Sequence, residues 1–299
     1  MMQALEGIRI LDLSKLLPGD YCGMILADMG AEVIKIEDPR GGDPIRQFQP
    51  QREGLSYWHL VLNRNKKSVI LDIRTPEGKE ALLKMAKDAD VLLESFRPGL
   101  MKSLGLSYEA LKEINPKLIY CSISGFGKEG FGEMRGAHDI NIVGLAGLKP
   151  NRQYQDQQVQ ISGITAGNHG AMGILAALHS RTVTGEGQQV DISMLRSTLS
   201  LLPIAFSNYW GEKDTKAPKY GTVKPNYRTY STSDGREIVV GAFEMKFWDR
   251  LCELLEFPEG KMWIHEPSQE EKLTVKMEEI FSSKTLVEWL EVIKGEDIC

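Results

Sequence analysis

Apolar residues follow two different spacings along the first half of the chain, and their alternation predicts a layered α/β fold. Residues 7–13 (GIRILDL) form a short apolar run typical of a buried strand, and residues 31–37 (AEVIKIE) form a second one. Between them, residues 16–30 (LLPGDYCGMILADMG) place apolar side chains at helical spacing and end on a glycine, a common helix terminator. Strand, helix and strand within about 30 residues predict a βαβ unit, and hence a parallel sheet.

The same alternation continues toward residue 195. Strand patterns recur in four further segments, at residues 62–73, 91–96, 117–127 and 188–195. Thr75 and Pro76 have the residue types preferred at an N-cap and at the first helical position, so a helix is expected from there. No GxGxxG motif follows the first strand. The pattern therefore predicts a Rossmann-like parallel sheet without the fingerprint of an NAD site.

A long helix rich in small residues is predicted over residues 159–181 (VQISGITAGNHGAMGILAALHSR). Small side chains allow the backbone of a helix to approach its neighbour closely. We therefore expect tight packing at the closely spaced small positions of this helix, which are Gly167, Gly170, Ala171 and Gly173.

The pattern changes after about residue 212. Residues 213–224 (KDTKAPKYGTVK) are polar with proline and glycine, as in a linker. Paired strand-like runs with a Ser-Asp-Gly turn follow, and then three helical segments. We expect a large Rossmann-like domain over residues 1–212, a linker over 213–224 and a small α+β domain over 225–299.

Composition narrows the class of function without identifying one. The 299 residues carry a net charge of −5, which argues against a nucleic-acid partner. No apolar run reaches the ~18 residues of a membrane span and the N-terminus lacks a secretory signal, so we expect a cytoplasmic protein without a membrane partner. The cysteines show no CxxC pair, which favours reduced thiols over disulfides or a zinc site; they are Cys22, Cys121, Cys252 and Cys299.

One histidine occupies a position that suits catalysis. His138 opens residues 135–148 (RGAHDINIVGLAGL), whose apolar, glycine-spaced pattern predicts a helix. A helix start offers unpaired backbone N–H groups and the positive end of the dipole, both of which favour a developing anion. Imidazole also titrates near neutral pH. From these residues alone two interpretations stay open: a catalytic group, or a histidine that caps or packs the helix.

Basic side chains gather near two of the predicted strands. Arg97 comes directly after a strand, at the sheet edge where ligands of open α/β folds bind. Another group precedes or begins the strand pattern of residues 62–73, and it forms either a solvated loop or a cradle for phosphate groups. Its members are Arg52, Arg64, Lys66 and Lys67.

Several motifs together carry a family resemblance. They cover nearly all of the chain and include GIRILDLSKLLPGDYCGMILADMGAEVIKIE, LNRNKKSVILDI, ESFRPG, LIYCSISGFGKEG, MGILAALHSRTVTGEGQQVDISM and YRTYSTSDGREIVVGAFE. With them the chain resembles the family III coenzyme A-transferases (CaiB/BaiF family), which also contain α-methylacyl-CoA racemases. GAHDIN resembles the GHDIN motif of the racemase branch. The resemblance implies a Rossmann-like large domain, a small domain, and interlocked dimers whose active site lies between the large domain of one chain and the small domain of the other.

The same resemblance implies an acyl-CoA or CoA substrate and no metal or redox cofactor, with coenzyme A present only as part of the thioester. The nucleotide part of CoA is then expected on Arg97, with Lys102 as a further candidate. A loop would contribute as well, through Asn63, Arg64, Lys66 and Lys67. The partner chain is expected to be a second copy or a homologous chain.

Racemase chemistry assigns roles around the histidine. Inverting a carbon beside a thioester requires removal of its α-proton, stabilisation of an enolate oxyanion and return of a proton on the other face. The resemblance makes His138 one acid/base and the backbone N–H of Asp139 the oxyanion donor. Glu244 matches a family glutamate close to the histidine, and it reads equally as an acidic residue at a helix N-terminus.

Two departures from the family pattern affect these expectations. A catalytic aspartate precedes the small-residue helix in both branches, and Gly163 stands in its place here. Ser162 and Thr165 cannot exchange protons with a carbon acid without an activating base, and Asp156 could act only if the loop is rearranged. The family also continues past the position of Cys299, so the chain resembles a C-terminally shortened member, and YGTVKP replaces the glycine loop of the transferases.

Three functions remain open from the sequence. The first is a racemase-like enzyme that removes and returns the α-proton of a 2-methylacyl-CoA, with His138 as one acid/base. The second is a CoA-transferase between carboxylic acids, as the subunit that lacks the aspartate nucleophile. The third is a catalytically silent CoA-binding protein.

Overall fold

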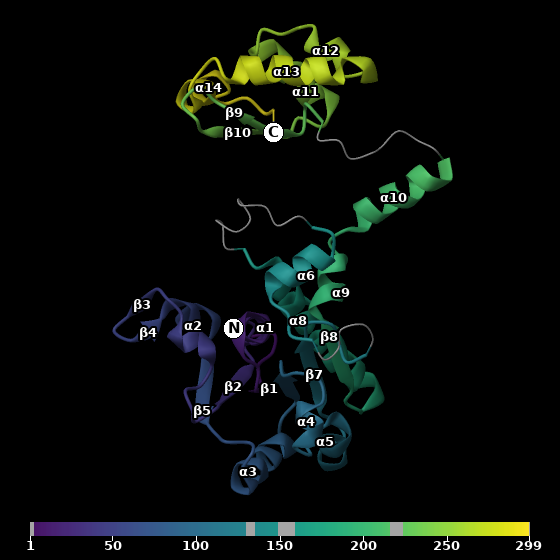
Figure 1. The fold of residues 1–299 in the computed structure, drawn as a ribbon. Coiled ribbons are helices and arrows are strands. Elements are labelled where there is room, and N and C mark those ends of the chain that lie inside the picture. Colours follow the sequence, from purple (N-terminus) through teal and green to yellow (C-terminus); the bar gives the residue numbers. More distant parts are fainter. Residues whose placement is uncertain (1–2, 130–134, 149–158, 216–223, 299) are drawn as a thin grey trace. The chain divides into compact units, whose positions relative to one another are not determined.

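The computed structural model describes residues 3–129, 135–148, 159–215 and 224–298, and it confirms the predicted α/β fold (Figure 1). One sheet contains six parallel strands in the order β5, β2, β1, β6, β7, β8. Because all six are parallel, their carboxyl ends lie along one edge, here called the carboxyl edge; the opposite one is the amino edge. The strands are β1 (Arg9–Asp12), β2 (Glu32–Glu37), β5 (Lys66–Ile70), β6 (Val91–Glu94), β7 (Ile119–Ser124) and β8 (Gln189–Ser193).

Helices cover both faces of this sheet. Side chains of successive strand residues point to opposite faces, so Ile10 packs in the core beneath α1 and α8 while Leu11 packs in the core beneath α3 and α5. The helices are α1 (Leu16–Asp28), α2 (Tyr57–Leu62), α3 (Pro76–Lys87), α4 (Leu100–Ser103), α5 (Tyr108–Ile114), α6 (Asp139–Leu145), α8 (Ile161–Thr184) and α9 (Met194–Leu199). Short elements between β2 and α2 are the 3₁₀ helix η1 (Pro44–Gln47) and the paired strands β3 (Gln51–Arg52) and β4 (Leu55–Ser56).

The small residues of α8 bring it against α1, as the sequence predicted. A Cβ atom placed on Gly167 would lie 2.8 Å from the carbonyl oxygen of Pro18, and one on Gly170 would lie 3.0 Å from Sγ of Cys22. Helix α1 follows β1 and helix α8 precedes β8, and both pack on the same face of the sheet. Because the strands are parallel, both helices begin at the carboxyl edge. This close packing sets the first turns of α1 and α8 side by side.

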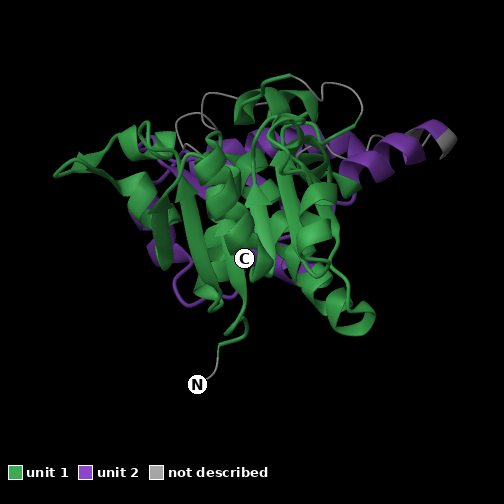
Figure 2. Cartoon of the chain, turned by 90° about the horizontal axis from the view of Figure 1, so that it is seen from below, with its two compact units in different colours: residues 1–203 green, residues 204–299 purple. Residues whose placement is uncertain are grey.

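Contacts divide the chain into two units, residues 1–203 and 204–299, which Figure 2 colours separately. We expected the large domain to extend to residue 212, but helix α10 (Pro203–Thr215) is continuous through that position and groups with the second unit. Residues 216–223 of the expected linker lie outside the described residues.

The second unit is an α+β structure with its own core. An antiparallel hairpin joins β9 (Arg228–Ser231) to β10 (Glu237–Val240). Trp248, Phe281 and Trp289 are almost fully buried between this hairpin and the helices. The helices are α11 (Met245–Leu254), α12 (Gly260–Trp263), α13 (Glu270–Phe281) and α14 (Leu286–Val292), with a 3₁₀ turn η2 (Pro267–Gln269). In neither unit do the described helices combine the length and apolar character needed to cross a membrane.

Candidate active site

A cavity of about 510 Å³ opens at the carboxyl edge of the sheet, within the first unit. Its wall combines the loops that follow β1, β6 and β7 with the first turns of α6 and α8. Three residues singled out in the sequence line it together: Arg97, His138 and Asp139. They come from segments about 40 residues apart, and the parallel sheet brings them together because each follows the carboxyl end of a strand.

His138 is the N-cap residue of α6, with an extended backbone (φ −111°, ψ 168°). Its backbone N–H donates to Oδ1 of Asn141 at 3.0 Å, which fixes the residue at the start of the helix. The side chain is exposed and belongs to the cavity lining. The imidazole therefore lies on the cavity wall beside the N-terminal end of α6.

Asp139 joins the first turn of α6 to the first turn of α8. Its Oδ1 accepts the backbone N–H of Ser162 at 2.7 Å, the hydroxyl of Ser162 at 2.6 Å and the backbone N–H of Gly163 at 3.3 Å. The carboxylate thus caps α8, where backbone N–H groups lack partners within the helix. The backbone N–H of Asp139 lies in the first turn of α6, where the helix itself offers no acceptor.

Gly163, which the family resemblance matches to the catalytic aspartate, lines the same cavity. A Cβ atom on Gly163 would lie 2.9 Å from Cδ2 of Leu17, so the side chain of Leu17 fills the space beside it. Among the described residues of the lining, Asp139 is the single acidic side chain. Asp156, the alternative considered from the sequence, lies outside the described residues.

Arg97 lies in the turn after β6, in contact with the segment that leads to His138. Its Nη2 would be 3.3 Å from a Cβ atom on Gly136, so the guanidinium rests against that backbone. The turn is held by the buried Glu94, whose Oε2 accepts the N–H of Phe96 at 2.7 Å. Burial raises the pKa of Glu94 to about 7, although the N–H of Phe96 and the charge of Lys128 oppose the rise.

The predicted phosphate loop lies elsewhere. The carboxyl ends of β2 and β5 are at the cavity's edge of the sheet, whereas the loop precedes β5 and belongs to the amino edge. There Arg64 pairs with Asp28, near the end of α1, and Lys67 pairs with Glu32, at the start of β2. The structure therefore does not bring this loop together with Arg97.

Lys66 and Asn63 point into the protein. The ammonium of Lys66 donates to Oδ2 of Asp12 at 2.9 Å and to the carbonyl of Asp20 at 3.0 Å, and its side chain is 1% exposed. The amide of Asn63 donates to Asp20 at 3.0 Å. We expected Lys66 to face a phosphate group, and the structure corrects this expectation. The ammonium of Lys66 instead donates hydrogen bonds to buried oxygens of Asp12 and Asp20.

The two remaining candidates stand apart from the cavity lining. Lys102 is exposed on α4 and does not line the cavity that holds His138. Glu244 is the exposed N-cap residue of α11, in the second unit, where its side chain makes no capping hydrogen bond.

A second cavity, of about 250 Å³, shares Lys15 and Phe96 with the first. Its floor is apolar, and Arg40 and Arg74 stand at its rim. Both arginines reach Asp38, at 3.0 Å from Arg40 and 3.2 Å from Arg74. The sequence analysis missed this basic group, although each arginine comes three or four residues after the end of a strand, the same signal that identified Arg97.

Beneath the cavities lies a layer of buried charges contributed by β1, β2, β5, α1 and the N-cap of η1. Its side chains are at most 2% exposed: Asp12, Asp20, Lys35, Asp43 and Lys66. Three carboxylates face two ammonium groups, so the layer would carry one excess negative charge. Burial raises the pKa of Asp20 to about 7 against the attraction of the lysines.

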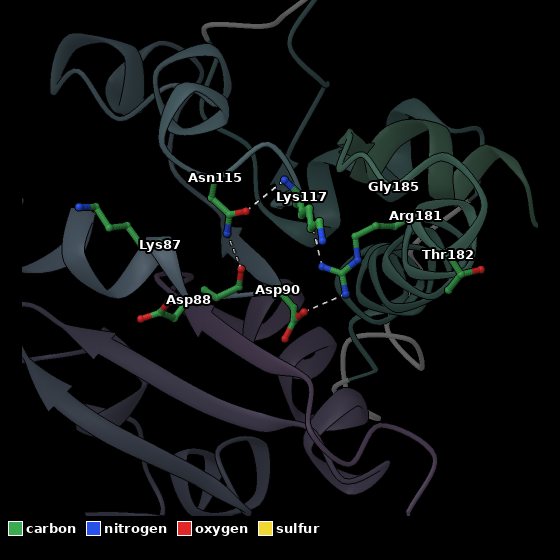
Figure 3. A pocket seen from close by; sticks show the side chains of 9 residues that line it. Lys87, Asp88, Asp90, Asn115, Lys117, Arg181, Thr182 and Gly185 are labelled. Atoms are coloured by element: carbon green, nitrogen blue, oxygen red, sulfur yellow. Dashed lines mark hydrogen bonds and ion pairs between the residues drawn. The ribbon is translucent and has the colours of Figure 1, made fainter.

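A further cavity, of about 400 Å³, lies at the amino edge (Figure 3). Two of its charged groups are bound to each other: Arg181 pairs with Asp90 at 2.8 Å, and it also donates to the backbone carbonyl of Lys117 at 3.2 Å. Asn115 bonds the carbonyls of Ala86 and Ala89. These contacts fasten α8 and the loop before β7 to the sheet. In the described part of the chain no group of three or more histidine, cysteine or acidic side chains is arranged to hold a metal.

Comparison with known proteins identifies the fold family. The sequence profile of CoA-transferase family III matches residues 5–299. The succinyl-CoA–D-citramalate CoA-transferase of Chloroflexus aurantiacus is 37% identical over 266 residues, which cover 85% of this chain and 65% of that protein. The alpha-methylacyl-CoA racemase of Homo sapiens is 34% identical over 315 residues, which cover 99% of this chain and 76% of that protein.

A solved structure agrees with these matches. The crystal structure of a CAIB/BAIF family protein from Brucella suis superposes with a TM-score of 0.82 at 32% identity, over 99% of this chain and 83% of that one. The chain spans about two thirds of the length of the Chloroflexus transferase. Sequence motifs, fold and relatives agree over nearly the whole chain, which therefore belongs to CoA-transferase family III, a family of enzymes that includes CoA-transferases and an α-methylacyl-CoA racemase.

Proposed function

We propose that this protein removes and returns the α-proton of a 2-methyl-branched acyl-CoA. The observation that carries the proposal is the exposed imidazole of His138 at the N-cap of α6, on the wall of the carboxyl-edge cavity. Deprotonation beside a thioester needs a base that is available near neutral pH and a donor for the enolate oxygen. His138 supplies the base, and the first turn of α6 directs backbone N–H groups and the helix dipole toward the same cavity.

The thioester is expected to lie with its carbonyl oxygen near the N–H of Asp139 and its α-carbon near His138. The acyl chain then has an apolar wall to pack against, formed by Leu17, Ile45 and Trp58. Since the carboxylate of Asp139 is occupied in capping α8, we assign its side chain a positioning role.

Deuterium exchange tests this reaction directly. The purified chain is incubated with (S)-2-methyloctanoyl-CoA in deuterated water, and the product is analysed for deuterium at the α-carbon and for configuration. Exchange with inversion supports a racemase, whereas exchange with retention indicates that His138 acts on one face alone. The absence of any exchange, with binding of the thioester intact, would reject the proposal and leave a CoA-transferase subunit or a silent CoA-binding protein.

The nucleotide part of CoA is proposed to occupy the second cavity, where Arg40 and Arg74 face an apolar floor that suits an adenine ring. Replacing either arginine by alanine is expected to weaken CoA binding about tenfold, because each loses a charge-assisted contact to phosphate. Titration calorimetry with CoA measures the change. Arg9→Ala is the matched control, since Arg9 makes a surface ion pair with Glu32 at the amino edge.

CoA transfer is the second proposal, and Gly163 is the observation that favours it in a particular form. With no side chain at the position of the family's aspartate, this chain would act as one subunit of a mixed dimer. A homologous chain that retains the aspartate would supply the nucleophile. Transfer of CoA from succinyl-CoA to a carboxylic acid only in the mixture, and never by either chain alone, would establish this reading. Size-exclusion chromatography with light scattering distinguishes it from the homodimer that we propose for the racemase.

A further inference from the structure

Two wall segments of the carboxyl-edge cavity meet at one buried carboxylate. The first begins with Leu16, at the start of α1, and the second begins with Ile45, in η1; both residues line the cavity. Asp43 accepts the N–H of Leu16 at 3.2 Å on Oδ1 and 3.1 Å on Oδ2, and the N–H of Ile45 at 3.0 Å. The two segments are thus tied together by a side chain that is 1% exposed.

Leu16 adopts a backbone conformation that leucine avoids. Its φ is +64°, in the left-handed region where the Cβ atom of an L-residue crowds the backbone, at a cost equivalent to about a tenfold change in an equilibrium constant. Such a conformation persists only when its surroundings enforce it. The bond from Asp43 supplies an enforcing contact on the backbone N–H of that residue.

Lys35 holds the carboxylate of Asp43 in place. Its ammonium lies 3.1 Å from Oδ2 of Asp43, donates to the carbonyl of Ser14 at 2.9 Å and pairs with Asp20. The side chain of Lys35 is 2% exposed, so all three contacts are shielded from water. A buried ion is costly unless it is paired and fully hydrogen-bonded, and this requirement fixes the geometry of the group. Ser14 and Leu16 flank Lys15, so both sides of this turn are anchored from below.

We propose that Asp43 is a positioning residue, which holds Leu16 in its left-handed conformation and thereby sets the separation of the two walls that receive the acyl chain. The inference rests on the proposed function only in taking an acyl-CoA as the ligand of this cavity. Asp43 lies below the cavity lining and acts through Leu16 and Ile45. Loss of the hydrogen bonds from Leu16 and Ile45 to Asp43 is expected to weaken binding of the acyl chain and to leave the proton-transfer step at His138 nearly unchanged.

The test compares Asp43→Asn with a carboxylate of similar structural importance that is far from the cavity. Asp90→Asn serves as that control, because Asp90 anchors Arg181 at the amino edge (Figure 3). For 2-methyloctanoyl-CoA we expect KM to rise about tenfold in Asp43→Asn, the factor that corresponds to the cost of a left-handed leucine, with kcat within about twofold. Asp90→Asn should change neither constant, whatever it does to the melting temperature.

A glycine at position 16 distinguishes a positioning role of Asp43 from a general contribution of Asp43 to the stability of the protein. Since glycine enters the left-handed region without steric cost, Asp43→Asn in a Leu16→Gly background should raise KM by no more than about twofold relative to Leu16→Gly alone. An equal tenfold rise in both backgrounds would overturn the proposal. So would a loss of thermal stability in Asp43→Asn without a change in KM.

Amide hydrogen exchange in the unmutated protein gives a test that does not depend on enzymatic activity. It applies even if the protein does not exchange substrate α-protons or if Asp43→Asn fails to fold. In the unmutated protein the amides of Leu16 and Ile45 should exchange as slowly as those of neighbouring strands, because both donate to buried Asp43. Rapid exchange at Leu16 would overturn the proposal whatever the activity. If the amides of Leu16 and Ile45 are protected but no α-proton exchange of the substrate occurs, the proposed reaction is rejected while the role of Asp43 is not. The dissociation constant of the thioester then replaces KM in the comparison of Asp43→Asn with Asp90→Asn.

Discussion

Candidate site residues differ in whether the fold leaves their side chains available to a ligand. His138 is exposed at a helix start, whereas the carboxylate of Asp139 beside it is bound by the first turn of α8. Arg97 lines the carboxyl-edge cavity, whereas the ammonium of Lys66 is buried in an ion pair with Asp12. Residue type was therefore enough to select candidate site residues. The hydrogen-bond and ion-pair partners of each side chain determine which of them are available to a ligand.

Replacing His138 by glutamine is expected to slow α-proton exchange at least a hundredfold, because general acid–base catalysis typically contributes 10² to 10⁴ in rate. Binding of the thioester should change by less than about twofold, since glutamine keeps a polar side chain of similar reach. His179→Gln, on the exposed end of α8, is the control and should retain full exchange. A His138→Gln variant with unimpaired exchange would remove the histidine from the mechanism.

Glu94 gives a prediction of pH dependence. Its pKa in the folded protein is raised by burial from 4.5 to about 7, so between these values the folded state binds a proton that the unfolded state releases. The resulting stability is complete below about pH 4.5 and is lost as the pH rises through about 7. Relative to Glu94→Gln, the protein should lose up to about 3 kcal/mol of unfolding free energy between pH 4.5 and 8.

Urea denaturation of both proteins across this range measures the difference. Asp20 also titrates near pH 7 but does so in both, so its contribution cancels. A difference between the two proteins that does not vary with pH would show that Glu94 is ionised throughout.

At the scale of elements, the interface between α1 and α8 determines where the catalytic loops begin. Both helices start at the carboxyl edge, and Gly163 and Gly167 of α8 lie against Leu17 and Pro18 at the start of α1. The small residues of α8 were visible in the sequence, and their role in close packing was predicted correctly. Local sequence marked helix starts equally well: Thr75 caps α3 through a 3.0 Å bond to the N–H of Gly78.

Gly167→Ala is expected to destabilise the protein by about 1–3 kcal/mol, because the new Cβ would lie 2.8 Å from the carbonyl oxygen of Pro18, a backbone atom that cannot turn aside. Gly144→Ala in α6 is the matched control. A Cβ there meets nothing within 4 Å, so helix propensity should stabilise that variant by up to about 1 kcal/mol. Thermal and urea unfolding measure both changes, and equal effects in the two variants would contradict the packing argument.

At the scale of the whole chain, the two units have separate hydrophobic cores. The core of the second unit includes the buried Trp248 and Trp289, whose indole N–H groups donate to the carbonyls of Gly260 and Phe281 within the same unit. Each of these contacts is available without the first unit. The contacts that form this core therefore lie within the second unit.

We expect residues 224–299 expressed alone to fold and to unfold cooperatively. A chain of this size buries a smaller fraction of its surface than a large domain, so its unfolding free energy should be only a few kcal/mol. Circular dichroism and tryptophan fluorescence during urea unfolding would follow the transition, and coincident curves are expected. A broad, non-cooperative transition would mean that this unit depends on the rest of the chain.

By itself, the sequence determined the strands of the parallel sheet, the family and the positions of His138 and Arg97, because hydrophobic spacing, caps and strand-end motifs are local signals. It did not predict the short elements η1, β3, β4 and α2. Only the tertiary structure decided which sheet edge receives each basic group and which charges are buried. Strand order depends on hydrogen bonds between distant segments, so residues 63–67 were assigned to the ligand before the amino edge was known. The fate of Lys66 depends on Asp12, 54 residues away, and the strained Leu16 depends on Asp43. Such long-range partners leave no mark in the local pattern.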